Sequence, residues 1–379
     1  MCVCVSGGTA HAQMQGTLRT ELYAFDDAPL SAVQTQNANR IELDLSGKFA
    51  LSDRLSFTLD GTIGTVDSAF SRIDKMGVNF DIGPSAVSLG YNTLAWSKSE
   101  FSRLSNVTNP ADYRFDPSGK TTIGQPMVRW DVPVGVGVIT AVAIPKTQDA
   151  RYPTATSRLR SFVPVTGAAQ YEKPADTPAY ALRYAASIGI ADIGLYGYVG
   201  PSREAAIVTD GQEAAPYYAW VQQVGLDAQM TFGSVVGKFE LRHTENQLNR
   251  NGVRDTGLAA SIGGEYAFYG VFGSPSDITA AVEYTWDERG VEAWRSTQND
   301  LFAGLRWSLQ NTADTQFKIG VQKDFDFDTA ALRLGFEHRI VDGLVVKSDA
   351  VFWQRSDPAD LAFGLSQDSY LRLTLEQSF

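Results

Sequence analysis

Apolar and polar residues alternate with a period of two along nearly the whole chain, and this alternation constrains the fold more than any other feature. In residues 369–379, Leu371, Leu373 and Leu375 alternate with polar side chains. The same pattern recurs in residues 40–49, 235–243, 278–286 and 332–340. Each such segment predicts a β-strand with one apolar face, because successive side chains of a strand point to opposite sides. Segments of about 9–11 residues match tilted strands that cross a bilayer, whereas strands of soluble sheets usually have about five or six residues.

Counting these segments predicts about 18 strands. They are residues 16–25, 40–50, 54–64, 72–82, 86–96, 123–132, 135–144, 178–188, 192–199, 219–230, 235–244, 258–269, 277–287, 300–310, 315–323, 330–340, 343–353 and 369–379. Tight connections fall at 51–53, 83–85, 133–134, 189–191, 231–234, 311–314 and 341–342. Long ones fall at 26–39, 97–122, 145–177, 200–218, 245–257, 288–299 and 354–368.

This alternation of connection lengths is typical of single-chain outer-membrane barrels, which have short turns at one end and long loops at the other. Placing both chain termini at the short-turn end requires an even number of strands. We therefore predict an all-β fold: a closed antiparallel transmembrane β-barrel of about 18 strands, with 16 as the alternative. Residues 13–379 form this single domain, with short periplasmic turns and long extracellular loops.

The sequence contains no segment that we expect to form a transmembrane helix. A spanning helix needs about 20 mostly apolar residues, and the uncharged, valine-rich run of residues 132–145 is shorter than that and contains two prolines and two glycines. Because lipid supplies no hydrogen-bond partners, only helices and closed sheets can span it. Closure also removes the strand edges that would otherwise promote aggregation.

Aromatic residues cluster near the predicted strand ends, where they would form girdles at the two membrane–water interfaces. The predicted outer girdle is Tyr196, Tyr198, Tyr217, Tyr218, Trp220, Tyr284, Trp286, Phe352, Trp353 and Tyr370. The predicted inner girdle is Phe49, Phe80, Tyr266, Phe268, Trp307 and Phe379.

The N-terminus carries a cleavage pattern for export. Ala10-x-Ala12 followed by Gln13 has the small-x-small form that signal peptidase cleaves, so we expect residues 1–12 to be the remnant of a signal peptide. Cleavage after Ala12 would remove Cys2 and Cys4, and an exported protein of this size without disulfides must be stabilised in another way.

Two segments resemble known families. The last strand, which ends in Phe379, resembles the C-terminal strand of Gram-negative outer-membrane proteins, which the barrel-assembly machinery recognises through its terminal phenylalanine. Leu89-Gly90-Tyr91 with Trp96, followed by the stretch from Asn106 to Arg114, is similar to a strand and loop of large porin-like barrels related to alginate-export porins. These resemblances imply a bacterial outer membrane, with lipid and lipopolysaccharide around the barrel and Phe379 as the assembly signal.

The predicted register places basic and acidic side chains in near balance on the inner face. The predicted pore-lining residues are Arg19, Glu21, Glu42, Asp44, Arg129, Asp131, Arg183, Lys238, Glu240, Arg242, Glu283, Arg306, Lys318, Arg333, Glu337, Lys347, Asp349, Arg372 and Glu376. A barrel of this strand number encloses a lumen wide enough for water, which favours a channel for the passive passage of small polar solutes.

The connections 97–122 and 145–177 are long enough to constrict or plug the lumen. Lys98, Arg103, Arg114 and Lys120 make the first basic, and Arg151, Arg158 and Arg160 do so for the second. A basic constriction would favour anions, whereas a mobile surface loop is the alternative interpretation.

Other functions receive less support. The net charge of −11 disfavours nucleic acid as a partner. A hydrolase would need a nucleophile beside a base, but His243 and His338 fall on the lipid-facing register, and no Gly-x-Ser-x-Gly or zinc-binding pattern is present. We therefore predict neither catalysis nor a metal or cofactor. Export of a polymer or apolar compound, and a closed structural or adhesin barrel, remain alternatives, and the oligomeric state stays open.

Overall fold

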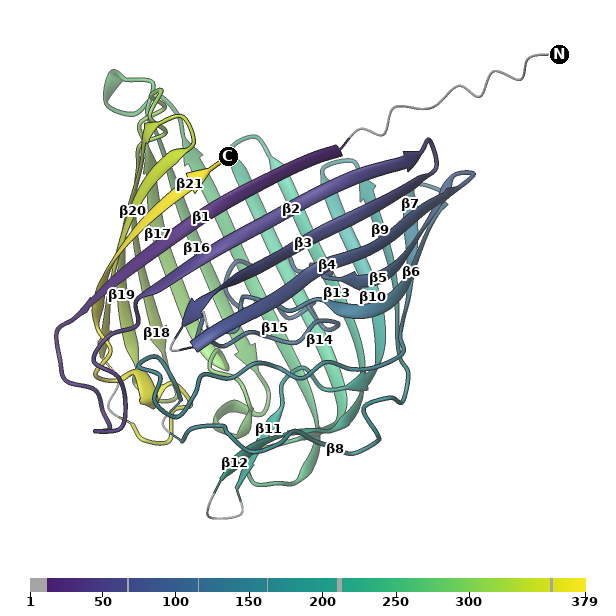
Figure 1. Ribbon diagram of the computed structural model, residues 1–379, viewed down its shortest axis with the longest axis horizontal. Helices are drawn as coiled ribbons and strands as arrows, with labels where there is room; N and C mark the ends of the chain where they lie inside the picture. Colours follow the sequence, from purple (N-terminus) through teal and green to yellow (C-terminus); the bar gives the residue numbers. More distant parts are fainter. Residues whose placement is uncertain (1–11, 67, 115, 162, 210–212, 355–356) are drawn as a thin grey trace.

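The computed structural model describes residues 12–379 apart from 67, 115, 162, 210–212 and 355–356, so the predicted signal segment falls almost entirely outside it. Eighteen antiparallel strands form one sheet, and it closes because β1 pairs with both β2 and β21 (Figure 1). In order, these strands are β1 (Ala12–Phe25), β2 (Arg40–Ser52), β3 (Leu55–Val66), β4 (Ser68–Ile82), β5 (Ser85–Asn92), β6 (Gln125–Val134), β7 (Gly137–Ile144), β9 (Ala179–Ile188), β10 (Ala191–Pro201), β13 (Trp220–Phe232), β14 (Val235–Leu248), β15 (Arg254–Phe268), β16 (Asp277–Asp287), β17 (Asn299–Ser308), β18 (Gln316–Asp324), β19 (Ala330–Val341), β20 (Leu344–Gln354) and β21 (Tyr370–Ser378). The predicted closed all-β barrel of 18 strands is confirmed.

The two faces of the sheet follow the sequence alternation. On β21, Leu371, Leu373 and Leu375 are each more than two-fifths exposed on the outside, while Arg372 and Glu376 form ion pairs on the opposite face. At the closing seam, Gly16 and Phe379 exchange two backbone hydrogen bonds, and the Phe379 ring covers Gly16 so closely that a β-carbon there would lie 2.5 Å from it. The barrel thus presents an apolar exterior and pairs its charges inside.

The two ends of the barrel differ, and the start of β1 and the end of β21 both lie at one of them (Figure 1). At this end, which we call the turn end, two-residue turns join β6 to β7 and β9 to β10, with Gly135 and Gly189 at φ 58° and 62°. The opposite, loop end carries the long connections. There β14 and β15 extend to Leu248 and Arg254, so most of the predicted loop 245–257 is strand.

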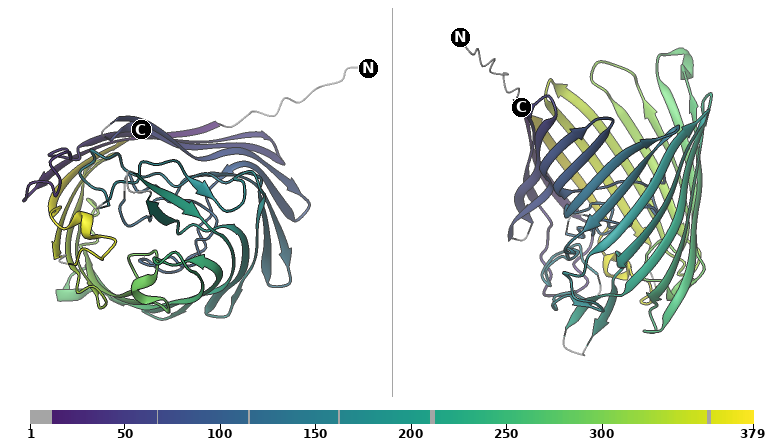
Figure 2. Two further views of the ribbon diagram at one scale, coloured as in Figure 1. Left: turned by 90° about the horizontal axis from the view of Figure 1, so that it is seen from below. Right: turned by 90° about the vertical axis from the view of Figure 1, so that its right-hand side faces the viewer.

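Short strands and 3-10 turns lie within the connections between the barrel strands. At the loop end, β8 (Gln170–Tyr171), β11 (Ala206–Thr209) and β12 (Ala214–Tyr218) form a separate three-stranded sheet. Three 3-10 turns complete the structure: η1 (Val271–Gly273), η2 (Gly290–Glu292) and η3 (Phe363–Leu365). Seen from below, the connections of the loop end fold across the interior of the barrel (Figure 2).

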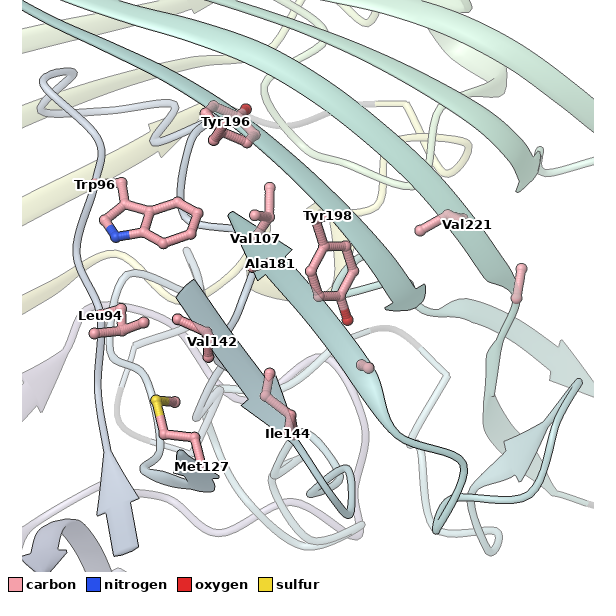
Figure 3. Packing of buried hydrophobic residues seen from close by; sticks show 12 residues of the cluster. Leu94, Trp96, Val107, Met127, Val142, Ile144, Ala181, Tyr196, Tyr198 and Val221 are labelled. Atoms are coloured by element: carbon pink, nitrogen blue, oxygen red, sulfur yellow. The ribbon is translucent and has the colours of Figure 1, made fainter. Parts of the chain in front are cut away.

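An apolar core lies inside the barrel, where the connection 93–124 packs on the interior face of β6, β7, β9, β10 and β13 (Figure 3). Its residues are Leu94, Trp96, Val107, Met127, Val142, Ile144, Ala179, Ala181, Tyr196, Tyr198, Ala219 and Val221. Close packing of these side chains excludes water from this part of the interior. This part of the interior is therefore apolar, whereas the sequence predicts charged residues along the inner face.

Part of the predicted outer girdle is wrong. Tyr196 and Tyr198 are buried in this interior core, and Trp353 and Tyr370 point inward beside Arg333 and Arg372. These residues occupy inward positions of their strands, so their proximity to strand ends does not bring them to lipid. Trp286 and Phe352, at outward positions, are exposed on the outside as predicted.

Candidate functional site

The connection between β5 and β6, residues 93–124, lies inside the barrel and is shaped by two asparagine side chains. The amide oxygen of Asn109 accepts a hydrogen bond from the Leu94 N–H at 2.9 Å. That of Asn106 accepts from the N–H groups of Trp96 and Ser97 at 2.8 and 3.0 Å. These bonds satisfy backbone donors that have no strand partner, as buried backbone groups require. We call residues 93–124 the inner loop.

Two buried carboxylates on the wall hold the inner loop. Glu240 of β14 accepts from the Ser97 hydroxyl and the Lys98 N–H at 2.5 Å each, from the Ser99 N–H at 2.8 Å and from the Ser105 N–H at 3.1 Å. Glu283 of β16 accepts from the N–H groups of Glu100 and Ser102 at 3.0 and 3.2 Å, and from the Ser99 hydroxyl. Hydrogen bonds to a charged group are stronger than neutral ones, so both carboxylates stabilise the loop conformation.

An ion-pair cluster around Glu204 joins the inner loop to the β10–β11 and β16–β17 connections. Glu204, between β10 and β11, binds Arg242 at 2.6 Å, Arg295 at 3.1 Å and Arg289 at 3.6 Å. Burial acts to raise the pKa of Glu204, but the guanidinium groups outweigh it and lower this pKa to about 2. Arg295 also donates to the backbone carbonyl of Ser102 in the inner loop at 3.1 Å. Glu204 is therefore ionised at neutral pH and fixes three arginines in place.

The connection between β7 and β9, residues 145–178, continues from the inner loop to the seam between β1 and β21. Backbone bonds join Arg151 to Ala111 and Tyr113, and the rings of Tyr113 and Tyr152 stack with centroids 5.1 Å apart. Beyond this contact, Arg158 is fully buried and forms an ion pair of 2.5 Å with Asp368. We call residues 154–160 the strap.

Arg158 ties three connections together. Its guanidinium donates to the carbonyls of Asp27 and Gln367 at 2.8 and 3.0 Å and lies 4.2 Å from the ring centre of Phe25. Arg160 donates to two carbonyls of its own connection. Both predicted constriction residues thus make buried structural contacts.

We expect the docking of the strap to depend on pH through Asp368. Burial raises the pKa of this carboxyl to about 6, against the opposing charges of Arg158 and Arg160 and with a contribution from Asp26. An acid whose pKa is higher in the docked state takes up a proton on docking, so docking is strongest at low pH and weakens as the pH rises through 6. Hydrogen exchange of residues 154–160, corrected for the intrinsic rate, should therefore be slower at pH 5 than at pH 7.5. Asp368→Asn should remove this pH dependence, and protection that grows with pH in the unchanged protein would contradict the assignment.

The opposite wall, β1, β2 and β19–β21, carries a network of ion pairs. Arg19 binds Glu42 and Glu376 at 2.9 and 2.8 Å, and Arg40 binds Glu21 at 2.6 Å. Further pairs are Arg19–Asp44, Arg372–Asp349, Arg372–Glu21 and Lys347–Glu376. These predicted residues lie together on one continuous inner surface, and most of their charges cancel in pairs.

The other predicted pore-lining residues also lie on the interior face. Their ion pairs are Arg129–Asp131, Arg183–Asp227, Lys238–Glu265, Lys238–Glu100 and Lys318–Glu337. Among the constriction candidates, Arg114 pairs with Asp112, and Lys98 uses its backbone N–H to bind Glu240. Several of these groups are therefore occupied by protein partners.

Three cations lie in or near the inner loop without a close acidic partner. Within the described ranges, Arg103 and Lys120 of the inner loop and Arg333 of β19 form no ion pair. Lys120 Nζ lies 4.7 Å from the ring centre of Phe101, and the Arg333 guanidinium lies 4.9 Å from that of Trp353. Burial lowers the pKa of Lys120, and the nearby charges of Arg333 and Arg103 lower it further, while Asp116 and Glu283 oppose them. The loop and the wall therefore bring positive charge together across the interior.

Sequence reasoning missed several charged residues of the interior. Glu204, Arg289 and Arg295 lie in connections whose paths the strand pattern does not determine. Arg72 binds Thr62 on the interior face because an irregularity between Asp60 and Gly61 shifts the register of β3 and β4. An extra residue in a strand reverses the alternation beyond it, and the sequence gives no clear signal of where that happens.

No cluster of three or more His, Cys, Asp or Glu side chains in the described residues is placed to hold a metal ion. The same residues include no helix with the length and apolar character needed to cross a membrane.

Comparison with known proteins identifies the fold and no family. No protein-family model matches the chain, and no curated protein matches its sequence. Among solved structures, OccAB3 of Acinetobacter baumannii is similar with a TM-score of 0.56 and 10% identity, over 97% of this chain and 99% of that one. OccD3 (OpdP) of Pseudomonas aeruginosa is similar with a TM-score of 0.55 and 10% identity, over 97% and 90% of the two chains. A relation to alginate-export porins stays a prediction, and the chain shares with these two proteins a large closed β-barrel.

Proposed function

We propose that this protein is a bacterial outer-membrane channel through which small polar solutes pass passively, and that its constriction prefers anions. The observation that carries the proposal is the convergence of Arg103, Lys120 and Arg333 between the inner loop and the opposite wall. Within the described residues none of these cations forms an ion pair, and Glu100, Asp116 and Glu283 act on Arg103 and Lys120 only through longer-range charge interactions, so an anion in transit would be an additional counter-charge.

The exterior supports a membrane location. Large apolar side chains are exposed on the outward positions of strand after strand, for example Leu195, Ile262, Leu305 and Leu334. Exposed apolar surface of this extent is unfavourable in water and favourable against acyl chains. In this proposal the loop end faces outward, lipid and lipopolysaccharide surround the barrel, and the turn end faces the periplasm.

The seam supports a role for Phe379 in assembly. Phe379 is nearly three-quarters exposed even though its backbone pairs with Gly16, so a terminal aromatic residue is available for recognition by the barrel-assembly machinery. Trimer and monomer are both compatible with this barrel.

Planar-bilayer recordings in a salt gradient test the channel and its preference together. We expect conductance steps and a reversal potential of the sign for anions, because positive charge at a narrow passage favours counter-ions. Replacing Lys120 and Arg333 together by glutamine should move the reversal potential towards cation preference. Lys323→Gln, which removes a positive charge from an outward position, is the matched control and should leave the potential unchanged.

The alternatives give different results in the same measurement. A closed structural or adhesin barrel gives no conductance steps from folded protein, and this outcome would overturn the proposal. An exporter of polymer or apolar compounds could conduct ions, but its reversal potential need not respond to Lys120 and Arg333.

A further inference from the structure

The connection between β15 and β16, residues 269–276, exposes two large aromatic side chains at the turn end of the barrel. Tyr269 is 69% exposed and Phe272 is 81% exposed. Phe272 also has φ 57°, in the left-handed region that residues with a β-carbon rarely adopt. A strained residue that exposes an apolar ring is unfavourable in water, so this combination indicates a functional contact.

Hydrogen bonds within the connection hold its conformation. The Val271 N–H donates to the Ser276 carbonyl at 2.8 Å. The Val271 carbonyl accepts from the N–H and the hydroxyl of Ser274 at 3.1 and 2.8 Å. At the start of the connection, the Gly270 N–H donates to the Asp277 carboxylate at 3.1 Å. A defined turn therefore presents the aromatic ring at its centre in a fixed position.

The Phe272 ring lies at one end of a band of aromatic rings on the outside of the barrel. It contacts Trp307 of β17 edge-on, with ring centres 5.9 Å apart. Phe317 of β18 lies 5.6 Å from Trp307, and Phe336 of β19 lies 5.3 Å from Phe317. Trp307 and Phe317 are opposite each other in the strand register, and Phe317 is likewise opposite Phe336. The connection and three wall strands therefore form one continuous aromatic surface.

This aromatic band borders the apolar exterior of the barrel. Leu305 and Ile319 are outward-facing and opposite each other, two positions farther from the turn end than Trp307 and Phe317. Trp307 is the last outward residue of β17. The band thus lies at the depth of a membrane–water interface, where aromatic side chains are favoured. Phe272 extends the band beyond the strand ends.

We propose that residues 269–276 are an interfacial anchor: the rings of Tyr269 and Phe272 insert into the phospholipid headgroup layer at the turn end and fix the depth of the barrel in the bilayer. Lipid is the partner because the aromatic band is continuous with the apolar exterior, and because the connection carries no charged side chain that would attract a charged partner. Transfer of the Phe272 ring from water to this layer offsets the strain of its backbone. The anchor is independent of the proposed channel and would also act in a closed barrel.

The stability of Phe272→Gly tests the surroundings of the ring. Glycine adopts φ 57° without strain, so replacing a ring that stands in water removes both the strain and an unfavourable exposed surface. Replacing a ring that is inserted in lipid removes a stabilising contact as well. We expect Phe272→Gly to lower the midpoint of urea unfolding of the barrel in phosphatidylcholine vesicles.

Gln310→Gly is the matched control. Gln310 has φ 52° and lies at the same end, in the connection 309–315, but its side chain is polar. Its amide makes one exposed hydrogen bond, to Asp277 at 2.9 Å. The control also accounts for the greater freedom that glycine gives the unfolded chain. Phe272→Gly should lower the midpoint more than Gln310→Gly does, and equal shifts in the two variants would overturn the anchor.

Electron paramagnetic resonance of an attached nitroxide measures the depth directly. Cys2 and Cys4 are the only cysteines of the chain, so Phe272→Cys can be labelled once both are replaced by serine. In phosphatidylcholine vesicles we expect oxygen, which partitions into lipid, to relax this nitroxide more strongly than a water-soluble nickel complex does. Val253→Cys is the control, because Val253 is also an exposed apolar residue but lies in a loop-end connection, where nickel should dominate. A nitroxide at position 272 that responds like the one at position 253 would show that the ring stands in water.

Discussion

Replacing Glu240 and Glu283 together by alanine should release the inner loop from the wall while the barrel stays folded. Glu240 is fully buried and accepts four hydrogen bonds from the loop, so its loss leaves several donors without a partner. An unsatisfied buried donor costs about 1–3 kcal/mol, and we expect the docking free energy of the loop to fall by at least about 3 kcal/mol. Limited proteolysis should then cut within residues 97–105, and single-channel recordings should show larger and noisier conductance.

Glu337→Ala is the control for this variant. Glu337 is also an interior carboxylate, but its ion pair with Lys318 is partly exposed, and such pairs contribute about 0–1 kcal/mol. Its proteolysis and conductance should match those of the unchanged protein. A double variant of Glu240 and Glu283 that resists the protease and conducts normally would contradict the anchoring role.

Gly90→Ala should impair folding of the whole barrel. Gly90 has φ 132°, and a β-carbon there would lie 2.3 Å from the carbonyl oxygen of Met76 and 2.7 Å from the α-carbon of Gly77. Both contacts are with backbone, so relief would require β4 and β5 to separate at the point where the chain turns into the inner loop. The strained conformation alone costs on the order of 1–3 kcal/mol, and the clash adds to it. Refolding yield into detergent, measured by the heat-dependent shift on gel electrophoresis, should fall strongly.

Gly237→Ala is the matched substitution. Gly237 also lies within a strand, β14, but a β-carbon there would meet no atom within 4 Å. Normal folding of Gly237→Ala beside poor folding of Gly90→Ala would assign the effect to the close approach of β4 and β5. Equal yields for the two variants would refute it.

The strand pattern could predict the barrel because each wall strand has one face that must be apolar. Leu371, Leu373 and Leu375 show this directly, and the prediction of 18 strands needed no knowledge of the interior. The resemblance around Gly90 and Asn106–Asn109 also has a physical basis in this chain. Gly90 permits the close approach of two strands, and the asparagines satisfy the backbone where the chain leaves the wall.

The interior was harder to predict because its contacts join residues far apart in the sequence. Ser97 and Glu240 are 143 positions apart, and Arg158 and Asp368 are 210 apart. No local pattern indicates which wall residue will accept a hydrogen bond from a loop. The uncharged run 132–145 did contain a signal, since Val142 and Ile144 face inward with almost no exposure. An apolar residue at an inward position indicates that protein, and not water, covers that part of the wall.

The apolar core behind the inner loop makes the barrel double-walled along β6, β7, β9, β10 and β13. In the proposed channel, a travelling solute would therefore follow an eccentric path along the remaining strands. A substitution such as Val142→Ala would loosen the packing between the inner loop and the wall, and it would not change a residue that contacts the solute. Because Arg19 and Arg372 are ion-paired, the electric field that the solute experiences on this wall would instead come mainly from Arg333 of β19.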